Sequence, residues 1–315
     1  MLNLRQMVTS LFLLALLVVP TGTNAEEIDR QRLAALMTPL AVEQVRQTLP
    51  EDIEWIPDIA YREGHGLWKL DLAMPKAHSE SPRPAVVIVH GGGWSRGDKR
   101  ANVWARYPVE YAKRGFVAVS VNYRLLPDHP FPACIEDVKT AVRWLRANAD
   151  KYNVDSNRIG AYGNSAGAHL ALMLGLSGPD PVLEGDGPYL DQSSRVQAVV
   201  GSASPTDLFN WTSESESTNR LLGGDPETMP ARARLASPLY HVTADAPPIL
   251  LIHGTNDATV PYEQPQRLMQ ALVAVGARDV SFKSYPGAGH GAFMQNINAT
   301  LPMSIAFFER TLALK

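Results

Sequence analysis

Short apolar runs recur at intervals along the chain, and helix-forming segments separate most of them. Several runs are continuous rather than alternating, which is typical of parallel strands buried on both faces. The first two runs are joined by Glu63-Gly64-His65-Gly66, a turn that indicates a hairpin. Eight strands are therefore predicted, over residues 53–62, 67–74, 85–90, 116–122, 158–162, 196–201, 249–253 and 280–285.

Helix-forming segments follow most of these strands. This alternation favours a mostly parallel sheet with helices on both faces, the α/β class. Residues 28–49 have helical spacing that is interrupted at Pro39, and they predict two short helices before the sheet. The other predicted helices span residues 103–114, 134–151, 166–176, 263–275 and 301–312.

Two stretches depart from the alternation. Residues 177–195 are rich in Gly, Pro and Asp and predict a loop. Residues 206–247 carry Ser/Glu-rich and Pro-rich segments, and we expect a small, partly helical, cap-like excursion there, after strand 6. Open α/β sheets bind ligands at the carboxyl edge of their strands, so this excursion is expected to shape the substrate pocket.

Composition fits a globular protein with a large core, since 45% of the 315 residues are hydrophobic. We expect a single domain over residues 26–315, because α/β folds of this size often form one domain. A net charge of −3 and a pI of about 6.2 provide no basic field for nucleic acid or anionic lipid. The single cysteine, Cys134, excludes an intrachain disulfide.

Residues 1–25 have the features of a secretory signal peptide. Arg5 supplies a positive charge, residues 11–19 form an apolar core, and Thr23-Asn24-Ala25 offers a cleavage site of small residues. The apolar run is short for a bilayer span, and an uncleaved N-terminal anchor is the alternative. We therefore expect export to a bacterial periplasm or to the medium, without stable membrane insertion after cleavage.

The candidate chemistry centres on Gly163-Asn164-Ser165-Ala166-Gly167, which matches the nucleophile elbow G-x-S-x-G. A strand-like run precedes this motif and good helix formers follow it, so Ser165 is predicted on a sharp strand-to-helix turn. Such a turn exposes the serine hydroxyl and directs the N–H of Ala166 toward a reacting carbonyl. A tight turn with an idle serine is the alternative, and the strand–helix context argues against it.

A second motif, His90-Gly91-Gly92-Gly93-Trp94, follows the third predicted strand. Three consecutive glycines let the backbone turn its N–H groups toward a substrate oxygen, as an oxyanion hole requires. The alternatives are a flexible surface loop and a phosphate-binding turn, and no Gly-Lys-Ser/Thr follows to support the latter.

Two further motifs follow the seventh and eighth strands and supply a candidate acid and base. Asp257 would hold a histidine in one tautomer and stabilise its charged form, although an aspartate that caps the next turn is the alternative. His290 lies among glycines and is the candidate base. His169 lies within a helix, His90 anchors the glycine loop, and His253 precedes the acid too closely. The chain order Ser, Asp, His completes a triad.

Together these motifs resemble the α/β-hydrolase superfamily, and within it the hormone-sensitive-lipase-like esterases and the bacterial feruloyl and acetyl-xylan esterase group. The resemblance extends from about Val86 to the C-terminus and includes Gly97-Asp98-Lys99 and Asn122-Tyr123-Arg124-Leu125. It implies an oxyanion hole formed by the N–H groups of Gly92, Gly93 and Ala166. It also implies supporting roles for His90, Gly91, Trp94, Tyr123 and Asp137, the last two holding the glycine loop and the nearby helix.

The expected function is that of an exported serine carboxylesterase, which works through an acyl-enzyme and needs no metal or organic cofactor. The resemblance implies acetyl- or feruloyl-type esters of polysaccharide, and a small soluble ester fits equally well. A short N-terminal region, where lipase-like relatives carry a long cap, favours short acyl chains. The alternatives are an exported serine peptidase or an arylformamidase-like amidase, and a non-catalytic binding module, against which the three triad members argue.

Overall fold

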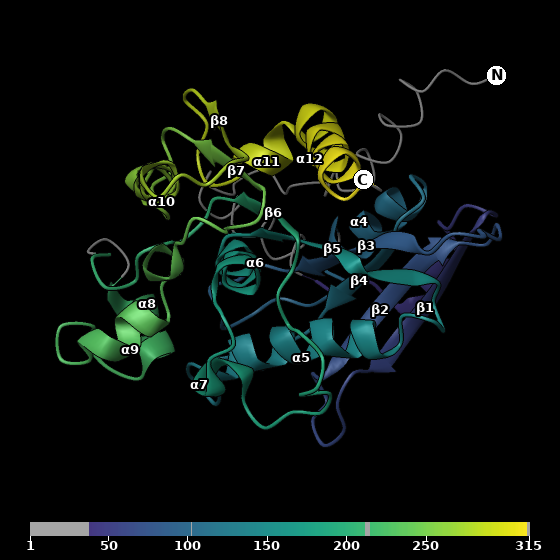
Figure 1. Cartoon of the computed structure of the whole chain (residues 1–315), viewed down its shortest axis with the longest axis horizontal. Helices are drawn as coiled ribbons and strands as arrows, with labels where there is room; N and C mark the ends of the chain where they lie inside the picture. Colours follow the sequence, from purple (N-terminus) through teal and green to yellow (C-terminus); the bar gives the residue numbers. More distant parts are fainter. Residues whose placement is uncertain (1–37, 102, 212–214, 314–315) are drawn as a thin grey trace, which may run out of the picture.

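The computed structural model describes residues 38–101, 103–211 and 215–313 (Figure 1). At its centre is an eight-stranded sheet with the order β1-β2-β4-β3-β5-β6-β7-β8. The β1/β2 and β2/β4 pairs are antiparallel and all other neighbours are parallel, which confirms the predicted mostly parallel sheet. The strands are β1 Ile53–Ala60, β2 Lys69–Pro75, β3 Arg83–Val89, β4 Val117–Val121, β5 Val154–Asn164, β6 Ala198–Ser202, β7 Ile249–Gly254 and β8 Val280–Tyr285.

Helices cover both faces of the sheet (Figure 1). Apolar side chains of α5, α6 and α10 pack on one face, and those of α4, α11 and α12 pack on the other. Every residue of β4, β6 and β7 is buried, which explains their continuous apolar runs. The helices are α3 Val42–Arg46, α4 Val103–Ala112, α5 Ala133–Ala147, α6 Ala166–Leu176, α7 Pro181–Glu184, α8 Ser215–Leu222, α9 Pro230–Leu235, η2 Pro238–His241, α10 Glu263–Ala274, α11 Ala292–Gln295 and α12 Ile297–Thr311.

The main departure from the predicted elements lies in residues 177–195, which contain the one-turn helix α7 instead of loop alone. The carboxylate of Asp180 accepts hydrogen bonds from the N–H groups of Val182 and Leu183, and Pro181 begins the helix. An aspartate cap followed by proline is a helix-start signal. Of the predicted helices over residues 28–49, α3 is described, whereas residues 28–37 and the predicted signal peptide lie outside the described residues.

The excursion between β6 and β7 is partly helical, as predicted, and carries α8, α9 and η2. It is integrated with the body of the protein, because the N–H of Phe131 donates to the carbonyl oxygen of Leu221 (2.7 Å). Four of its large apolar side chains are buried in the same core as α5 and α6; they are Leu208, Trp211, Leu221 and Leu222.

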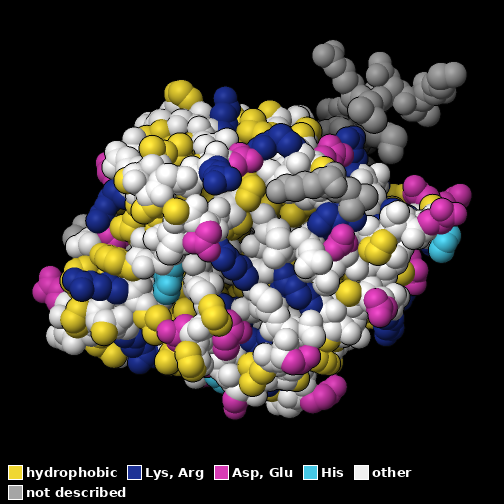
Figure 2. All heavy atoms as spheres, viewed as in Figure 1, with side chains coloured by type: hydrophobic (Ala, Val, Ile, Leu, Met, Phe, Trp, Pro, Cys, Tyr) yellow, Lys and Arg dark blue, Asp and Glu magenta, His cyan; other side chains and the backbone are white. Residues whose placement is uncertain are grey.

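The surface carries charges of both signs. Figure 2 shows Lys and Arg side chains interspersed with Asp and Glu over the face in view. None of the helices in the described ranges is both long enough and apolar enough to cross a membrane.

Candidate active site

Ser165 lies on the turn between β5 and α6, with a φ of 54° and a ψ of −125°. A Cβ atom on Gly163 would lie 2.1 Å from the carbonyl oxygen of Gly167, and one on Gly167 would lie 2.1 Å from that of Val89. Strand and helix therefore approach too closely for any side chain, so both positions require glycine. The N–H of Ser165 donates to the carbonyl oxygen of Ser202 on β6 (2.8 Å), which ties the turn to the neighbouring strand.

The three residues predicted as a triad meet at the carboxyl edge of the parallel strands. His290 Nε2 lies 3.0 Å from Ser165 Oγ, and His290 Nδ1 lies 2.9 Å from Asp257 Oδ2 and 3.1 Å from Oδ1. The side chain of His290 is 31% exposed, whereas that of Asp257 is fully buried. This geometry lets Ser165 pass its proton to Nε2 while Asp257 holds the Nδ1–H tautomer.

Asp257 is held by more groups than His290. Its Oδ1 accepts hydrogen bonds from the N–H groups of Thr259 and Val260, each at 2.9 Å. His253, on β7, places Nε2 3.3 Å from Oδ2 of Asp257 and 2.9 Å from the carbonyl oxygen of Val260. Burial alone would raise the pKa of Asp257, but hydrogen bonds from His253 and His290 outweigh it and hold that pKa well below its usual range. The carboxylate is therefore ionised at neutral pH.

The glycine loop after β3 passes directly beside the nucleophile elbow. A Cβ atom on Gly91 would lie 2.8 Å from the carbonyl oxygen of Asn164 and 3.4 Å from the Cβ of Ser165. Further along, a Cβ atom on Gly97 would lie 2.4 Å from His90 Nδ1. The loop thus closes on its own first residue, and any side chain at either glycine would push it away from Ser165.

The predicted oxyanion hole has its donors available. Gly92, Gly93 and Trp94 all have positive φ, at 125°, 60° and 57°. Within the described part of the chain, the N–H groups of Gly92 and Gly93 donate to no other group. The N–H of Ala166, at the first position of α6, has no acceptor within its helix. All three N–H groups are therefore available to an oxygen acceptor, as the predicted oxyanion hole requires.

His90 and Tyr123 fix the start of the glycine loop, in line with the supporting roles that the resemblance implies. The O–H of Tyr123 donates to the carbonyl oxygen of His90 (2.9 Å), and the two rings stack with centroids 4.4 Å apart. Both side chains are buried, and burial lowers the pKa of His90. A neutral, packed pair therefore anchors the loop.

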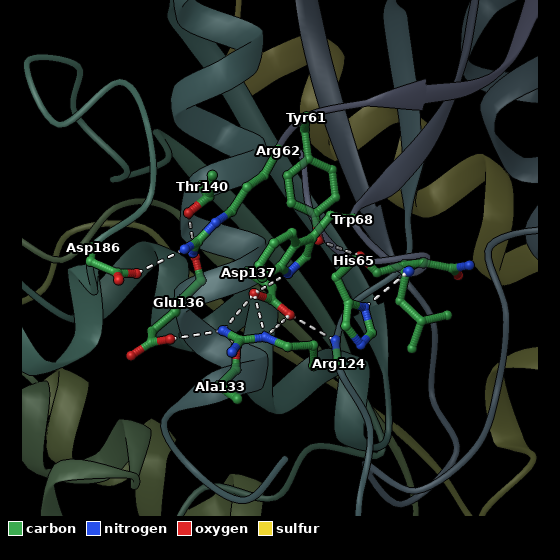
Figure 3. Close-up of polar contacts among 12 residues, drawn as sticks. Tyr61, Arg62, His65, Trp68, Arg124, Ala133, Glu136, Asp137, Thr140 and Asp186 are labelled. Atoms are coloured by element: carbon green, nitrogen blue, oxygen red, sulfur yellow. Dashed lines mark hydrogen bonds and ion pairs between the residues drawn. The ribbon is translucent and has the colours of Figure 1, made fainter. Parts of the chain in front are cut away.

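Asp137, near the start of α5, acts on the segment next to Tyr123 and not on the glycine loop itself. Its carboxylate accepts hydrogen bonds from the Trp68 indole N–H (2.8 Å) and from the backbone and guanidinium N–H groups of Arg124 (Figure 3). The guanidinium carbons of Arg62 and Arg124 lie 4.1 and 5.3 Å from the Trp68 ring centroid. The cluster joins the β1–β2 turn, the segment after β4 and α5.

An open hollow of about 530 Å³ lies between the segment after β4 and α8; it is lined by Pro127, Glu216, Asn219, Arg220 and Gly223. Neither Ser165 nor His290 lines it, so the hollow is not where the reaction takes place. Within the described ranges, no three His, Cys, Asp or Glu side chains converge as metal ligands do.

Sequence reasoning missed two contributors to the site. His253 was set aside as a base because it precedes Asp257 too closely, yet that closeness lets its Nε2 reach the carboxylate. The four-residue spacing of the two residues was the available signal. Trp68, which binds Asp137, lies 69 residues away from it along the chain, and no motif marks it.

Comparison with known proteins gives a consistent assignment. The BD-FAE family profile matches residues 70–272. Esterase LipC of Mycobacterium tuberculosis is 36% identical over 70% of this chain and 56% of its own length. The chain spans about half the length of the curated relatives it matches.

Two groups of solved structures have the same fold. A truncated form of a carbohydrate esterase from gut microbiota has a TM-score of 0.75 and 31% identity, covering 84% of this chain and 99% of that one. Thermogutta terrifontis Est2, a thermophilic esterase with butyrate bound, has a TM-score of 0.67 and 27% identity, covering 83% and 94%. With the sheet order above, these matches confirm the predicted α/β-hydrolase fold and the predicted resemblance. The chain belongs to the BD-FAE family, within the hormone-sensitive-lipase-like group of α/β-hydrolase serine esterases.

Proposed function

We propose that this protein is a serine carboxylesterase that hydrolyses short-chain or carbohydrate-linked esters. The observation that carries the proposal is the hydrogen-bonded path from Ser165 Oγ through His290 to Asp257, at 3.0 and 2.9 Å, together with the N–H groups of Gly92 and Gly93, which donate to no group among the described residues. A nucleophile, a base, an orienting acid and preformed donors are the four parts that ester cleavage by acyl transfer requires.

The reaction proceeds in two halves. Ser165 Oγ attacks the ester carbonyl carbon while His290 Nε2 accepts the serine proton, and the oxyanion binds the N–H groups of Gly92, Gly93 and Ala166. The tetrahedral intermediate then breaks its bond to the alcohol oxygen, which takes the proton from His290 and leaves acyl-Ser165. Water attacks this ester in the same way, with His290 again accepting and returning a proton, and the acid departs.

Short acyl chains are favoured because the excursion has little apolar surface left to line a tunnel. The side chains of Leu208, Leu221 and Leu222 are fully buried in the core, and Trp211 is 6% exposed. Phe209 is partly buried, with the guanidinium carbon of Arg234 4.9 Å from its ring centroid. The butyrate in the Thermogutta terrifontis esterase structure is an acyl group of the size proposed here.

A carbohydrate alcohol group is supported by the similarity of this chain to the carbohydrate esterase from gut microbiota. The hollow beside α8 has Glu216, Asn219 and Arg220 in its wall and offers polar groups to a remote part of such a substrate. It is linked to the glycine loop, since the N–H of Leu126, next to Pro127 in its wall, donates to the carbonyl oxygen of Trp94 (2.9 Å). Acetylated xylo-oligosaccharides should therefore be hydrolysed with a lower KM than p-nitrophenyl acetate. An equal or higher KM for the oligosaccharides would favour a small soluble ester.

A substrate panel tests the activity itself. p-Nitrophenyl acetate and butyrate should give a higher kcat/KM than the dodecanoate, because each methylene without an apolar wall forgoes about 0.8 kcal/mol of binding. A maximum at ten carbons or beyond would contradict the short-chain proposal. Cleavage of peptide anilides or N-formyl arylamines without ester turnover would indicate the peptidase or arylformamidase alternative, and a folded but inert protein would indicate a binding module.

Export is a further part of the proposal and rests on the signal-like residues 1–25. Expression of the full chain in a bacterial host should yield a periplasmic or secreted protein whose mass corresponds to a start at Glu26. A membrane-bound product that keeps residues 1–25 would instead indicate an uncleaved anchor.

A further inference from the structure

We propose that His169 is a positioning residue that holds the glycine loop (residues 90–97) through Trp94, and that the excursion after β6 sets the tautomer of His169. His169 lies in the first turn of α6, where its N–H donates to the carbonyl oxygen of Ser165 (3.1 Å), and its side chain is fully buried. Its Nδ1 lies 3.2 Å from Trp94 Nε1. Its Nε2 lies 2.7 Å from the carbonyl oxygen of Ala236, the residue that ends α9.

The chemistry of the two partners allows only one protonation state. A carbonyl oxygen only accepts, so the Nε2 atom of His169 must carry a hydrogen to bind Ala236. An indole N–H only donates, so Nδ1 must present its lone pair to Trp94. The ring is therefore neutral with hydrogen on Nε2, and burial, which lowers the pKa of His169 to about 4, maintains that state at neutral pH.

The glycine loop needs such a restraint because its backbone is strained. Trp94 is a non-glycine residue with a φ of 57°, and it directly follows two glycines of positive φ. Its indole is 2% exposed and meets the rings of His169 and Trp211 edge to face, at centroid distances of 5.4 and 6.4 Å. Because donor positions must hold within about half an ångström for catalysis, fixing Trp94 also fixes the neighbouring N–H of Gly93.

His169 thereby connects three elements: α6, which follows Ser165, the glycine loop, and α9 of the excursion. The excursion is anchored at the same point, since Ser237 Oγ donates to the carbonyl oxygen of Ala233 (2.7 Å) and accepts from the N–H of Leu208 (2.8 Å). A shift of α9 would release Nε2 of His169, permit the other tautomer and turn an N–H toward Trp94. The inference rests on the proposed esterase function, because it assigns the loop to oxyanion binding.

Three substitutions separate the two hydrogen bonds. The amide oxygen of asparagine lies near the position of histidine Nδ1, and the amide nitrogen of glutamine lies near that of Nε2. His169→Asn thus keeps an acceptor for Trp94, whereas His169→Gln keeps a donor for Ala236, and Trp94→Phe removes the indole donor but keeps an aromatic ring. Tyr111→Phe is the control, because it removes a buried hydrogen bond, between its O–H and Ser304 Oγ, on the opposite face of the sheet.

We expect kcat to fall about tenfold in His169→Gln and in Trp94→Phe, with KM within about twofold, since displacing an oxyanion donor costs less than the 10²- to 10³-fold of removing one. His169→Asn should stay within about threefold of wild type, and Tyr111→Phe should be unchanged. The double variant Trp94→Phe/His169→Gln should be no worse than either single one. The affinity of a trifluoromethyl ketone, whose adduct places an oxyanion in the hole, should change in parallel with kcat.

Lower melting temperatures with unchanged kcat and ketone affinity would overturn the inference and make His169 a packing residue. Equal losses in His169→Asn and His169→Gln would overturn the assigned tautomer. If the variants at His169 fail to fold, Trp94→Phe alone decides, by the same kcat and ketone measurements. Hydrogen exchange of the Trp94 indole N–H, slow in the wild type and faster in His169→Gln, tests the bridge without activity. A wild type inactive on every ester would contradict the proposed function instead.

Discussion

The glycine loop at residues 90–97 and the histidine loop at residues 286–291 meet at Ser165 but are held in different ways. The glycine loop is fixed by buried, uncharged hydrogen bonds, from Tyr123 to His90 and from Trp94 to His169. The histidine loop presents a side chain that is 31% exposed and is oriented by an ionised carboxylate.

The difference follows from the task of each loop in the proposed reaction. Oxyanion donors act best when they do not move, because any reorganisation adds to the barrier. A general base must instead exchange protons with substrate and water, so it needs exposure and a charge partner that stabilises its protonated form. Substitutions on the two sides should therefore differ in kind: loss of charge should alter pH behaviour, and loss of packing should alter stability and the geometry of the hole.

Ser165→Ala removes the group that both sides serve and should have the largest effect. We expect a loss of about a millionfold in kcat on p-nitrophenyl butyrate, with residual catalysis from the oxyanion hole and binding. A fluorophosphonate probe should label the wild type at Ser165 and leave the variant unlabelled. Ser177→Ala, at the far end of α6, is the control and should be labelled as the wild type is. Labelling that persists in Ser165→Ala would refute the assignment of the nucleophile.

Asp257→Asn tests the histidine loop, whose base is oriented by an ionised carboxylate. The amide keeps the shape of the carboxylate but favours the wrong tautomer of His290, and kcat should fall on the order of 10⁴-fold near neutral pH. Steady-state kinetics from pH 5 to 10 should show the loss throughout this range. Asp207→Asn, at another buried carboxylate, which pairs with Arg267 at 2.7 Å, should lower stability and leave the pH–rate profile unchanged. Near-wild-type activity of Asp257→Asn would mean that another carboxylate is the acid.

The sequence predicted the sheet well because the burial of its strands has a local signature. The strands of the sheet's centre are apolar over most of their length, except β5, whose first five residues are mostly polar and which begins at Val154, four residues before its predicted start. All were predicted within a few residues of their observed bounds. Helix ends were less accurate: the helix predicted over residues 134–151 ends at Ala147, and the one predicted from residue 301 begins at Ile297. Packing against the body, and not the residues at the boundary, decides such ends.

The residues of the candidate site also differ in whether they could be predicted from the sequence. Ser165, Asp257 and His290 lie in short motifs that follow the parallel strands β5, β7 and β8, so their meeting at one edge of the sheet could be predicted from topology. The partner of Trp94 could not, because His169 lies 75 residues further along the chain and has the ordinary place of a helix residue. A hydrogen bond between two motifs becomes visible only when β3 and α6 are packed together.

Acid should lower the stability of the protein through the buried side chain of His169, which binds Trp94 of the glycine loop. The pKa of His169 is lowered to about 4 from its ordinary value of 6.5 by burial, and nearby His241 adds to the shift. Below pH 6.5 the unfolded chain takes up a proton that the folded chain refuses until about pH 4, so the free energy of unfolding falls across this window. The shift corresponds to about 3 kcal/mol at most.

Urea unfolding at pH 7, 5.5 and 4 measures this loss. His169→Asn should lose less stability over the window than the wild type, because asparagine does not titrate. Part of the loss should remain in the variant, since burial also lowers the pKa of His90. Parallel dependences on pH for the two proteins would mean that His169 is not a source of the acid sensitivity.

Tyr123→Phe should have the smallest effect on kcat, and it tests most directly whether a buried hydrogen bond fixes the glycine loop. It leaves the buried carbonyl oxygen of His90 without its donor, which should cost about 1–3 kcal/mol of stability. Tyr61→Phe is matched to it, because the O–H of Tyr61 donates to the carbonyl oxygen of Asn122 at 2.8 Å and the side chain is equally buried. Both variants should lose similar stability in urea unfolding. Only Tyr123→Phe should also lower kcat, by about threefold, because His90 begins the loop that carries the oxyanion donors. Equal kcat in the two variants would mean that the glycine loop keeps its geometry without Tyr123, and that its own glycines and Trp94 suffice to fix it.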